Sequence, residues 1–201
     1  MPLISFIGVH GSGKTSTARL LARLYPGCYL YHELEAIDEA HGLSPAARQL
    51  LFLSRFVEGY LRAYRESQSA GKTVVMDSHP VLVPAYSRWW LRGHAEDAVE
   101  AMEKLLQALP PADLLVYIRA GDPKEIARRI LARGRAVARE EADPEYIEFI
   151  DREASRIVEE HGASLARRIM VLDALEPLEE KARRVHAEHA RLARGARACS
   201  C

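Results

Sequence analysis

Glycine, lysine and threonine residues near the N-terminus have the spacing of a phosphate-binding loop. The stretch reads Gly8-Val9-His10-Gly11-Ser12-Gly13-Lys14-Thr15 and fits the pattern G-x-x-x-x-G-K-[ST]. Glycines let successive backbone N–H groups turn toward phosphate oxygens, and a following helix adds the positive end of its dipole. Lys14 would reach the β- and γ-phosphates, and Thr15 would offer a hydroxyl ligand to Mg²⁺. We therefore predict that this segment, the phosphate loop, binds ATP and Mg²⁺.

The residues on either side of the phosphate loop supply the context that the motif needs. Residues 3–7 form a short apolar run, which indicates a buried strand, and a helical pattern runs from 14 to 25 until Pro26-Gly27 stops it. The alternative for His10 is a side chain that lies in solvent and does not contact the nucleotide. The alternative for Ser16 is a residue that only continues the helix. The predicted ATP-binding residues are Gly8, His10, Gly11, Ser12, Gly13, Lys14, Thr15 and Ser16.

Strand and helix patterns alternate along the rest of the chain. The further strands are expected at 28–33, 73–76, 114–118 and 169–172. The further helices are expected at 44–71, 95–108, 122–133, 143–161 and 176–195. This alternation predicts an α/β fold, a three-layer α/β/α domain over 1–201 with a five-stranded parallel sheet.

An acidic residue, Asp77, comes directly after the expected strand 73–76. Parallel sheets bind ligands at the carboxyl ends of their strands, so Asp77 is expected to lie beside the phosphate loop. There it would hold Mg²⁺ through water or accept the proton of an acceptor group. The alternative is an aspartate that only caps a turn.

With these pieces in place, nearly the whole chain resembles the nucleoside and nucleotide kinases, especially thymidylate kinases and deoxynucleoside kinases. The phosphate loop is the one highly specific motif. Segment 50–56 resembles the helix that carries an acceptor-binding arginine, here Arg55, and segment 71–77 resembles the strand that ends in the acid at the reaction centre. Tyr86 lies where thymidylate kinases often have tyrosine. The resemblance implies a P-loop kinase-like fold, with Arg55 and Tyr86 as substrate-binding residues.

An arginine-rich stretch at 127–135 resembles the lid of these kinases, and we place the lid at approximately 128–143. Lid arginines neutralise the charge that spreads over the transferring phosphoryl oxygens. Arg129 and Arg133 share a helix face by spacing, and Arg135 falls in the expected loop after the helix. The alternative is a solvated charged face. The resemblance thus implies catalytic roles for Lys14, Asp77, Arg129, Arg133 and Arg135, with Thr15 and Asp77 at the metal.

The chain departs from the family directly after its acid. These kinases usually have arginine there, whereas this chain has Ser78-His79. The tripeptide Asp77-Ser78-His79 also resembles the Asp-Thr-His of archaeal-type adenylate kinases. The departure removes a phosphate-binding group. Segment 143–147 resembles the deoxynucleoside-kinase segment after the lid, and 171–174 resembles the last strand, whose following loop lines the adenine pocket. Trp89-Trp90 would either stack on a nucleobase or pack in the core.

The expected activity is ATP-dependent phosphoryl transfer, that of a phosphotransferase. The favoured acceptor is a (deoxy)nucleoside monophosphate, as in thymidylate kinase. One alternative is a deoxynucleoside kinase with Asp77 as base. A second alternative is a regulatory P-loop ATPase without a small acceptor. The absence of an arginine after Asp77 is the reason to retain this alternative.

The composition sets limits on partners. The formal net charge of the 201 residues is zero, which argues against nucleic-acid and membrane-surface binding. Three cysteines make no disulfide framework, and the N-terminus lacks the basic region and cleavage site of a secretory signal. We expect a cytoplasmic protein whose partner is a small nucleotide or nucleoside acceptor, and a homodimer is left open.

Overall fold

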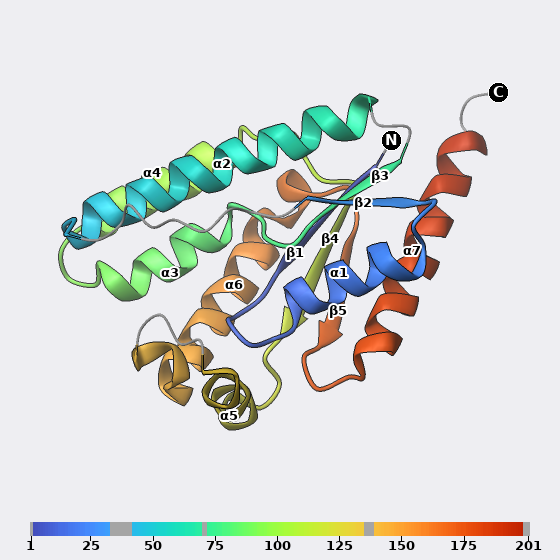
Figure 1. Ribbon diagram of the computed structural model, residues 1–201. Helices are drawn as coiled ribbons and strands as arrows, with labels where there is room; N and C mark the ends of the chain where they lie inside the picture. Colours follow the sequence, from blue (N-terminus) through green and yellow to red (C-terminus); the bar gives the residue numbers. More distant parts are fainter. Residues whose placement is uncertain (1, 33–41, 70–71, 135–138, 199–201) are drawn as a thin grey trace.

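The computed structural model describes residues 2–32, 42–69, 72–134 and 139–198. Five strands form one parallel sheet in the order β2-β3-β1-β4-β5 (Figure 1). The strands are β1 (Leu3–Ile7), β2 (Tyr29–His32), β3 (Thr73–Met76), β4 (Leu114–Arg119) and β5 (Ile169–Asp173). All five residues of the central strand β1 are buried, as its predominantly apolar sequence predicts.

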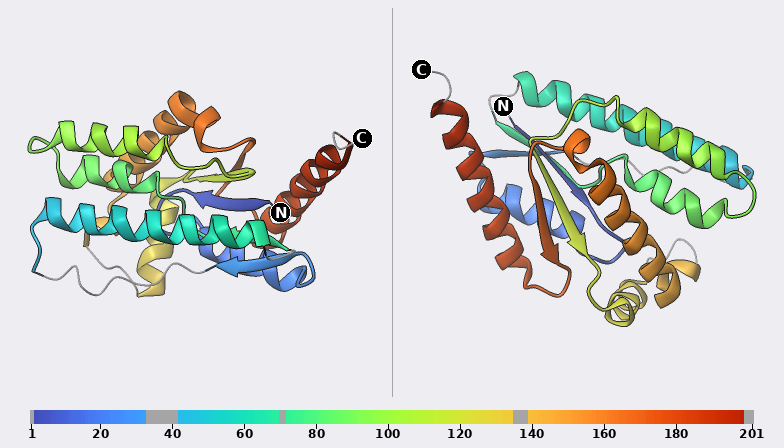
Figure 2. Two further views of the ribbon diagram at one scale, coloured as in Figure 1. Left: turned by 90° about the horizontal axis from the view of Figure 1, so that it is seen from above. Right: turned by 180° about the vertical axis from the view of Figure 1, so that it is seen from behind.

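Helices cover both faces of the sheet. They are α1 (Lys14–Leu24), α2 (Pro45–Ser69), α3 (Leu82–Trp90), α4 (Glu96–Leu106), α5 (Pro123–Arg133), α6 (Pro144–Leu165) and α7 (Leu178–Ala198), with a 3₁₀ helix η1 (Arg139–Ala142) before α6. Figures 1 and 2 show α1 and α7 together on one face, and α2, α3, α4 and α6 on the other. The three-layer α/β/α architecture is therefore confirmed.

Local sequence signals set several helix starts. The carboxylate of Asp122 accepts the backbone N–H of Lys124 at 2.9 Å, and that of Asp143 accepts Glu145 N–H at 2.9 Å. Each cap is followed by proline at the first helical position, where no N–H is needed. The hydroxyl of Ser44 accepts Ala47 N–H at the start of α2. These helices begin where the sequence predicts.

Two features of the fold were not predicted. Helix α3 lies in a stretch where the sequence analysis expected no helix, and six of its nine residues are buried. Helix α6 continues four residues beyond the expected end at 161. Gly162 lies inside that extension, where a Cβ would stand only 2.5 Å from Cδ1 of Ile169. Here glycine permits close packing of helix on strand and does not end the helix.

Candidate active site

The phosphate loop connects β1 to α1 at the carboxyl end of the sheet. Gly8 has a φ of 141° and Gly11 a φ of 77°, which are backbone conformations that other residues rarely adopt. A Cβ on Gly8 would collide with the carbonyl oxygen of Ile118 in β4, and one on Gly11 would stand 2.8 Å from Cγ1 of Ile130 in α5. The glycines therefore also let the loop pack tightly against β4 and α5.

Lys14 folds back over the phosphate loop. Its Nζ donates to the carbonyl oxygens of Gly8 at 2.7 Å and Val9 at 2.9 Å. Burial lowers the pKa of Lys14 from 10.5 to about 8; the carboxylate of Asp77 opposes this shift, and the guanidinium of Arg133 adds to it. The ammonium is thus held inside the loop by two carbonyls, which phosphate oxygens would replace on nucleotide binding.

Asp77 meets the phosphate loop at the end of β3. Its Oδ2 accepts a hydrogen bond from Thr15 Oγ1 at 2.8 Å and another from the Tyr31 hydroxyl at 3.0 Å. Its other oxygen, Oδ1, is buried and has no hydrogen-bond partner among the described residues. A buried carboxylate oxygen costs free energy unless it is paired, so this atom is suited to a cation or to an acceptor hydroxyl.

The same oxygens fit Mg²⁺. The Thr15 hydroxyl and the Asp77 carboxylate adjoin each other and are the hard oxygen donors that this metal prefers. Within the described part of the chain, no group of three or more His, Cys, Asp or Glu side chains could hold a metal. The ion would accordingly take its remaining ligands from substrate phosphates and water, as Mg²⁺ in phosphoryl-transfer sites usually does.

Helix α5 carries two of the predicted arginines. Arg133, in its last turn, is exposed and close enough to Lys14 to lower the lysine pKa. It makes no ion pair within the described residues. Arg129 donates from Nε to Glu125 Oε1 at 3.0 Å and from Nη1 to the Ala174 carbonyl at 2.9 Å. Arg135 lies outside the described residues.

Comparison with known proteins connects this geometry to a fold family. No protein-family model matches the sequence, and no curated protein matches it. Among solved structures, the protein is similar to deoxyadenosine kinase from M. mycoides, determined with the products dCMP and a flexible dCDP bound; the match covers 94% of this chain and 99% of that chain, with a TM-score of 0.68 and 13% identity. The protein has the P-loop kinase fold.

In this P-loop kinase fold, His10 and Tyr86 lie together beside the phosphate loop. Their ring centroids are 4.9 Å apart. The His10 side chain is 45% exposed, and its Nε2 is 3.9 Å from Oε1 of Glu141 in η1. His10 therefore links the loop to α3 on one side and to the expected lid segment on the other.

The remaining predicted residues lie in simpler surroundings. Ser16 is half-buried in the first turn of α1, and Ser12 is fully buried with no hydrogen-bond partner for its hydroxyl among the described residues. Arg55, on α2, is 47% exposed and its Nη1 is 3.7 Å from Oε2 of Glu58. The structure thus brings Lys14 and Asp77 together but leaves Arg55 on an exposed helix face.

Trp89 belongs to the core of the fold. It is 9% exposed, and its ring meets those of Tyr146 and Phe149 edge-on, each at a centroid distance of 5.2 Å. The guanidinium of Arg92 lies 4.2 Å from the Trp89 ring centroid. This packing agrees with the core role for Trp89 and not with stacking on a nucleobase.

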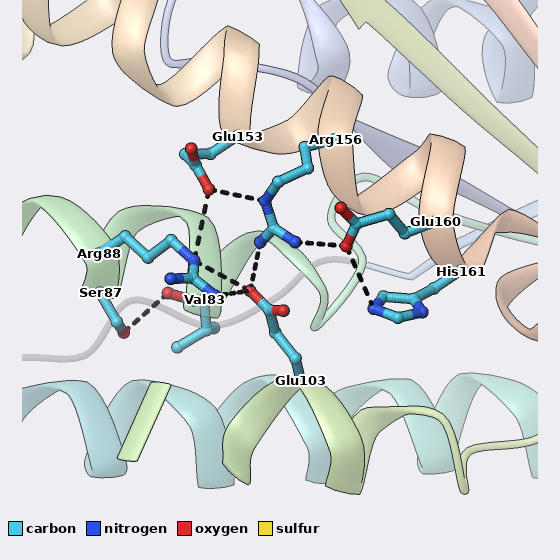
Figure 3. Close-up of polar contacts among 8 residues, drawn as sticks. All are labelled: Val83, Ser87, Arg88, Glu103, Glu153, Arg156, Glu160 and His161. Atoms are coloured by element: carbon cyan, nitrogen blue, oxygen red, sulfur yellow. Dashed lines mark hydrogen bonds and ion pairs between the residues drawn. The ribbon is translucent and has the colours of Figure 1, made fainter. Parts of the chain in front are cut away.

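An ion-pair network fixes α3 relative to α4 and α6. Figure 3 shows Arg88 of α3 and Arg156 of α6 meeting at the buried carboxylate of Glu103 in α4. The distances to Glu103 Oε1 are 3.1 Å from Arg88 and 2.6 Å from Arg156, and Arg88 Nε is also 3.3 Å from Oε2 of Glu153. Both arginines are therefore occupied by carboxylates of the protein itself.

Two residues at the site escaped the sequence analysis. Tyr31 reaches Asp77 because β2 pairs with β3 in a register that places Tyr31 beside Val75. The sequence of a short strand does not indicate which strand it pairs with or in which register. Lys181 is 3% exposed next to the phosphate loop. One sequence feature could have singled out Lys181: it is a lysine in the first turn of an expected helix, where the helix dipole disfavours cations.

No helix in the described part of the chain is long and apolar enough to cross a membrane.

Proposed function

We propose that the protein catalyses ATP-dependent phosphoryl transfer to a nucleoside or nucleotide. The observation that carries this proposal is the convergence of Lys14, Thr15 and Asp77, which come from two strand ends 62 residues apart, at a single point of the sheet edge. Each has a task in such a transfer. Lys14 binds the phosphates, Thr15 faces the metal, and Asp77 serves the metal or the acceptor proton.

Catalysis in this site would be positioning combined with charge stabilisation. Mg²⁺, held by Thr15 and by Asp77 directly or through water, would neutralise charge on the phosphate oxygens. Lys14 would orient the same phosphates, and Arg133 would approach from α5 as charge develops on the transferred group. The buried Oδ1 of Asp77 is the atom we assign to the proton of an acceptor hydroxyl.

The surroundings of α3 favour a nucleoside over a monophosphate as acceptor. A monophosphate needs a cation of its own, yet Arg88 is bound by Glu103 and Glu153, and Arg92 lies over Trp89. Arg55 of α2, the acceptor-binding arginine that the resemblance implies, lies on an exposed helix face with Oε2 of Glu58 3.7 Å from its Nη1. We therefore place the deoxynucleoside-kinase alternative ahead of the thymidylate-kinase type that the sequence favoured, because a sugar hydroxyl requires only a base.

A panel of acceptors tests the proposal. Protein and Mg·ATP are incubated with each deoxynucleoside, ribonucleoside and monophosphate in turn, and ADP release is measured against the rate without acceptor. We expect at least one deoxynucleoside to raise the rate about tenfold or more. Stimulation by monophosphates alone would restore the thymidylate-kinase type, and ADP release unaffected by every acceptor would favour the regulatory ATPase.

Two lysine variants control the assay. Lys14→Met should abolish acceptor-dependent ADP release, since it removes the charge at the phosphates. Lys72→Met should leave it unchanged, because Lys72 is exposed and donates to the Pro26 carbonyl near the start of β3, at the opposite edge of the sheet.

A further inference from the structure

A buried lysine of α7 lies against the phosphate loop and has no role in the scheme above. Lys181 is 3% exposed, and its Nζ donates to the carbonyl oxygen of Ala174 at 2.9 Å. The same Nζ is 3.5 Å from the position that a Cβ would occupy on Gly13. Lys181 therefore joins the segment that follows β5 to the residue that precedes Lys14.

The surroundings of Lys181 are unfavourable for a cation. Arg129 donates to the same Ala174 carbonyl at 2.9 Å, which brings two positive side chains to one acceptor. Lys181 lies in the first turn of α7, and Gly13 is the N-cap of α1, so the positive ends of two helix dipoles meet there. Burial lowers the pKa of Lys181, and Arg129 adds to the shift.

The nearby acidic groups offset this charge only in part. Glu176 and Asp173 raise the pKa of Lys181, against the effects of burial and of Arg129. Glu176, however, is also paired with Arg184, whose Nη1 is 2.6 Å and 2.7 Å from its two carboxylate oxygens. Lys181 and Arg129 thus place two cationic side chains behind the phosphate loop, and an anion bound by that loop would attract both.

We infer that Lys181 is a positioning residue for the nucleotide, holding segment 173–176 against the phosphate loop and adding positive charge behind the bound triphosphate. The inference rests on the proposed function, since it assumes that the phosphate loop binds ATP. Lys181 acts on substrate and transition state alike because it stands behind the loop and does not touch the transferred group. Its loss should consequently raise KM for ATP and leave kcat nearly unchanged.

Two variants separate charge from packing. Lys181→Met keeps most of the side-chain length and removes both the charge and the donor, whereas Lys181→Gln removes the charge and keeps an N–H donor. Arg183→Met is the matched control, because Arg183 lies on the same helix, is 64% exposed and pairs with Glu180. Dissociation constants are measured by calorimetry for Mg·ATP and for inorganic tripolyphosphate, which has the charges but no base.

Both Lys181 variants should bind ATP and tripolyphosphate about tenfold more weakly, the effect of one charge removed at short range in a partly buried site. Arg183→Met should stay within twofold of the wild type. A folded Lys181→Gln protein that binds tripolyphosphate normally would overturn the inference, even if its stability fell, and so would a loss confined to kcat. A wild-type protein that binds ATP but transfers nothing to any acceptor would refute the proposed function and leave the role of Lys181 intact.

Discussion

The affinity for ATP should fall as pH rises through the pKa of Lys14. This pKa is lowered from 10.5 to about 8, first by burial and further by Arg133, while Asp77 opposes the shift. A group with a pKa of about 8 is roughly 90% protonated at pH 7 and roughly 10% at pH 9. Only the ammonium form can pair with the triphosphate, so the association constant should drop about tenfold over this interval.

The direction follows from the linkage between binding and protonation. Phosphate oxygens favour the charged form of Lys14 and raise its pKa in the complex, so binding takes up a proton wherever free Lys14 is neutral. At pH 9 the uptake should approach about 0.9 proton per ATP. The terminal phosphate of ATP is already ionised above pH 7, because its pKa is near 6, so it adds little to this uptake.

Calorimetry in two buffers of different ionisation enthalpy measures both quantities. The matched variant is Lys14→Arg, whose guanidinium keeps its proton throughout this range and should give a nearly flat profile. Arg133→Ala should move the fall to higher pH, because Arg133 contributes to the lowered pKa. An equally steep fall in Lys14→Arg would show that another group titrates and would refute this account.

Three further outcomes are expected. Asp77→Asn should reduce acceptor-dependent transfer by roughly 10²-fold or more with little change in thermal stability. Near-normal turnover of this variant would indicate that Asp77 only caps a turn. Arg133→Ala should lower kcat more than it weakens ATP binding. An unchanged kcat would indicate that Arg133 is a solvated surface residue without a catalytic role. Burial lowers the pKa of His79 to about 3, so its stabilising effect is complete above pH 6.5 and is lost as pH falls toward 3, at about 1.4 kcal/mol per pH unit. Urea unfolding at pH 6.5 and 5 should show this fall, and an equal fall in His79→Gln would assign it to other groups.

Local features of the fold were predictable from the sequence alone. The phosphate loop, the buried strand before it and the helix after it are encoded within about 25 consecutive residues, through the glycines at 8, 11 and 13, Lys14 and Thr15. The aspartate caps at 122 and 143 are likewise local, since each side chain bonds a backbone N–H two residues later. Such signals need no tertiary contact, because the interacting groups are neighbours in the chain.

The lid arginines show where this reasoning stops. Helical spacing puts Arg129 and Arg133 on one face, but it does not reveal what stands opposite that face. In the structure Arg129 is bound to the Ala174 carbonyl, 45 residues away, whereas Arg133 stays exposed near Lys14. Whether either arginine acts in catalysis, as predicted, is a question for the variants described above.

The sequence by itself therefore determined the glycine-rich loop after β1 and the phosphate-binding role predicted for it, because the loop carries its own donors, its own glycines and its own helix end. Only the tertiary structure decided what surrounds that site. The order β2-β3-β1-β4-β5 places Asp77 and Tyr31 beside Thr15, and the packing of α7 on α1 places Lys181 behind Gly13. These contacts join segments far apart in the chain, and their partners are set by strand order and helix packing, which no local pattern specifies.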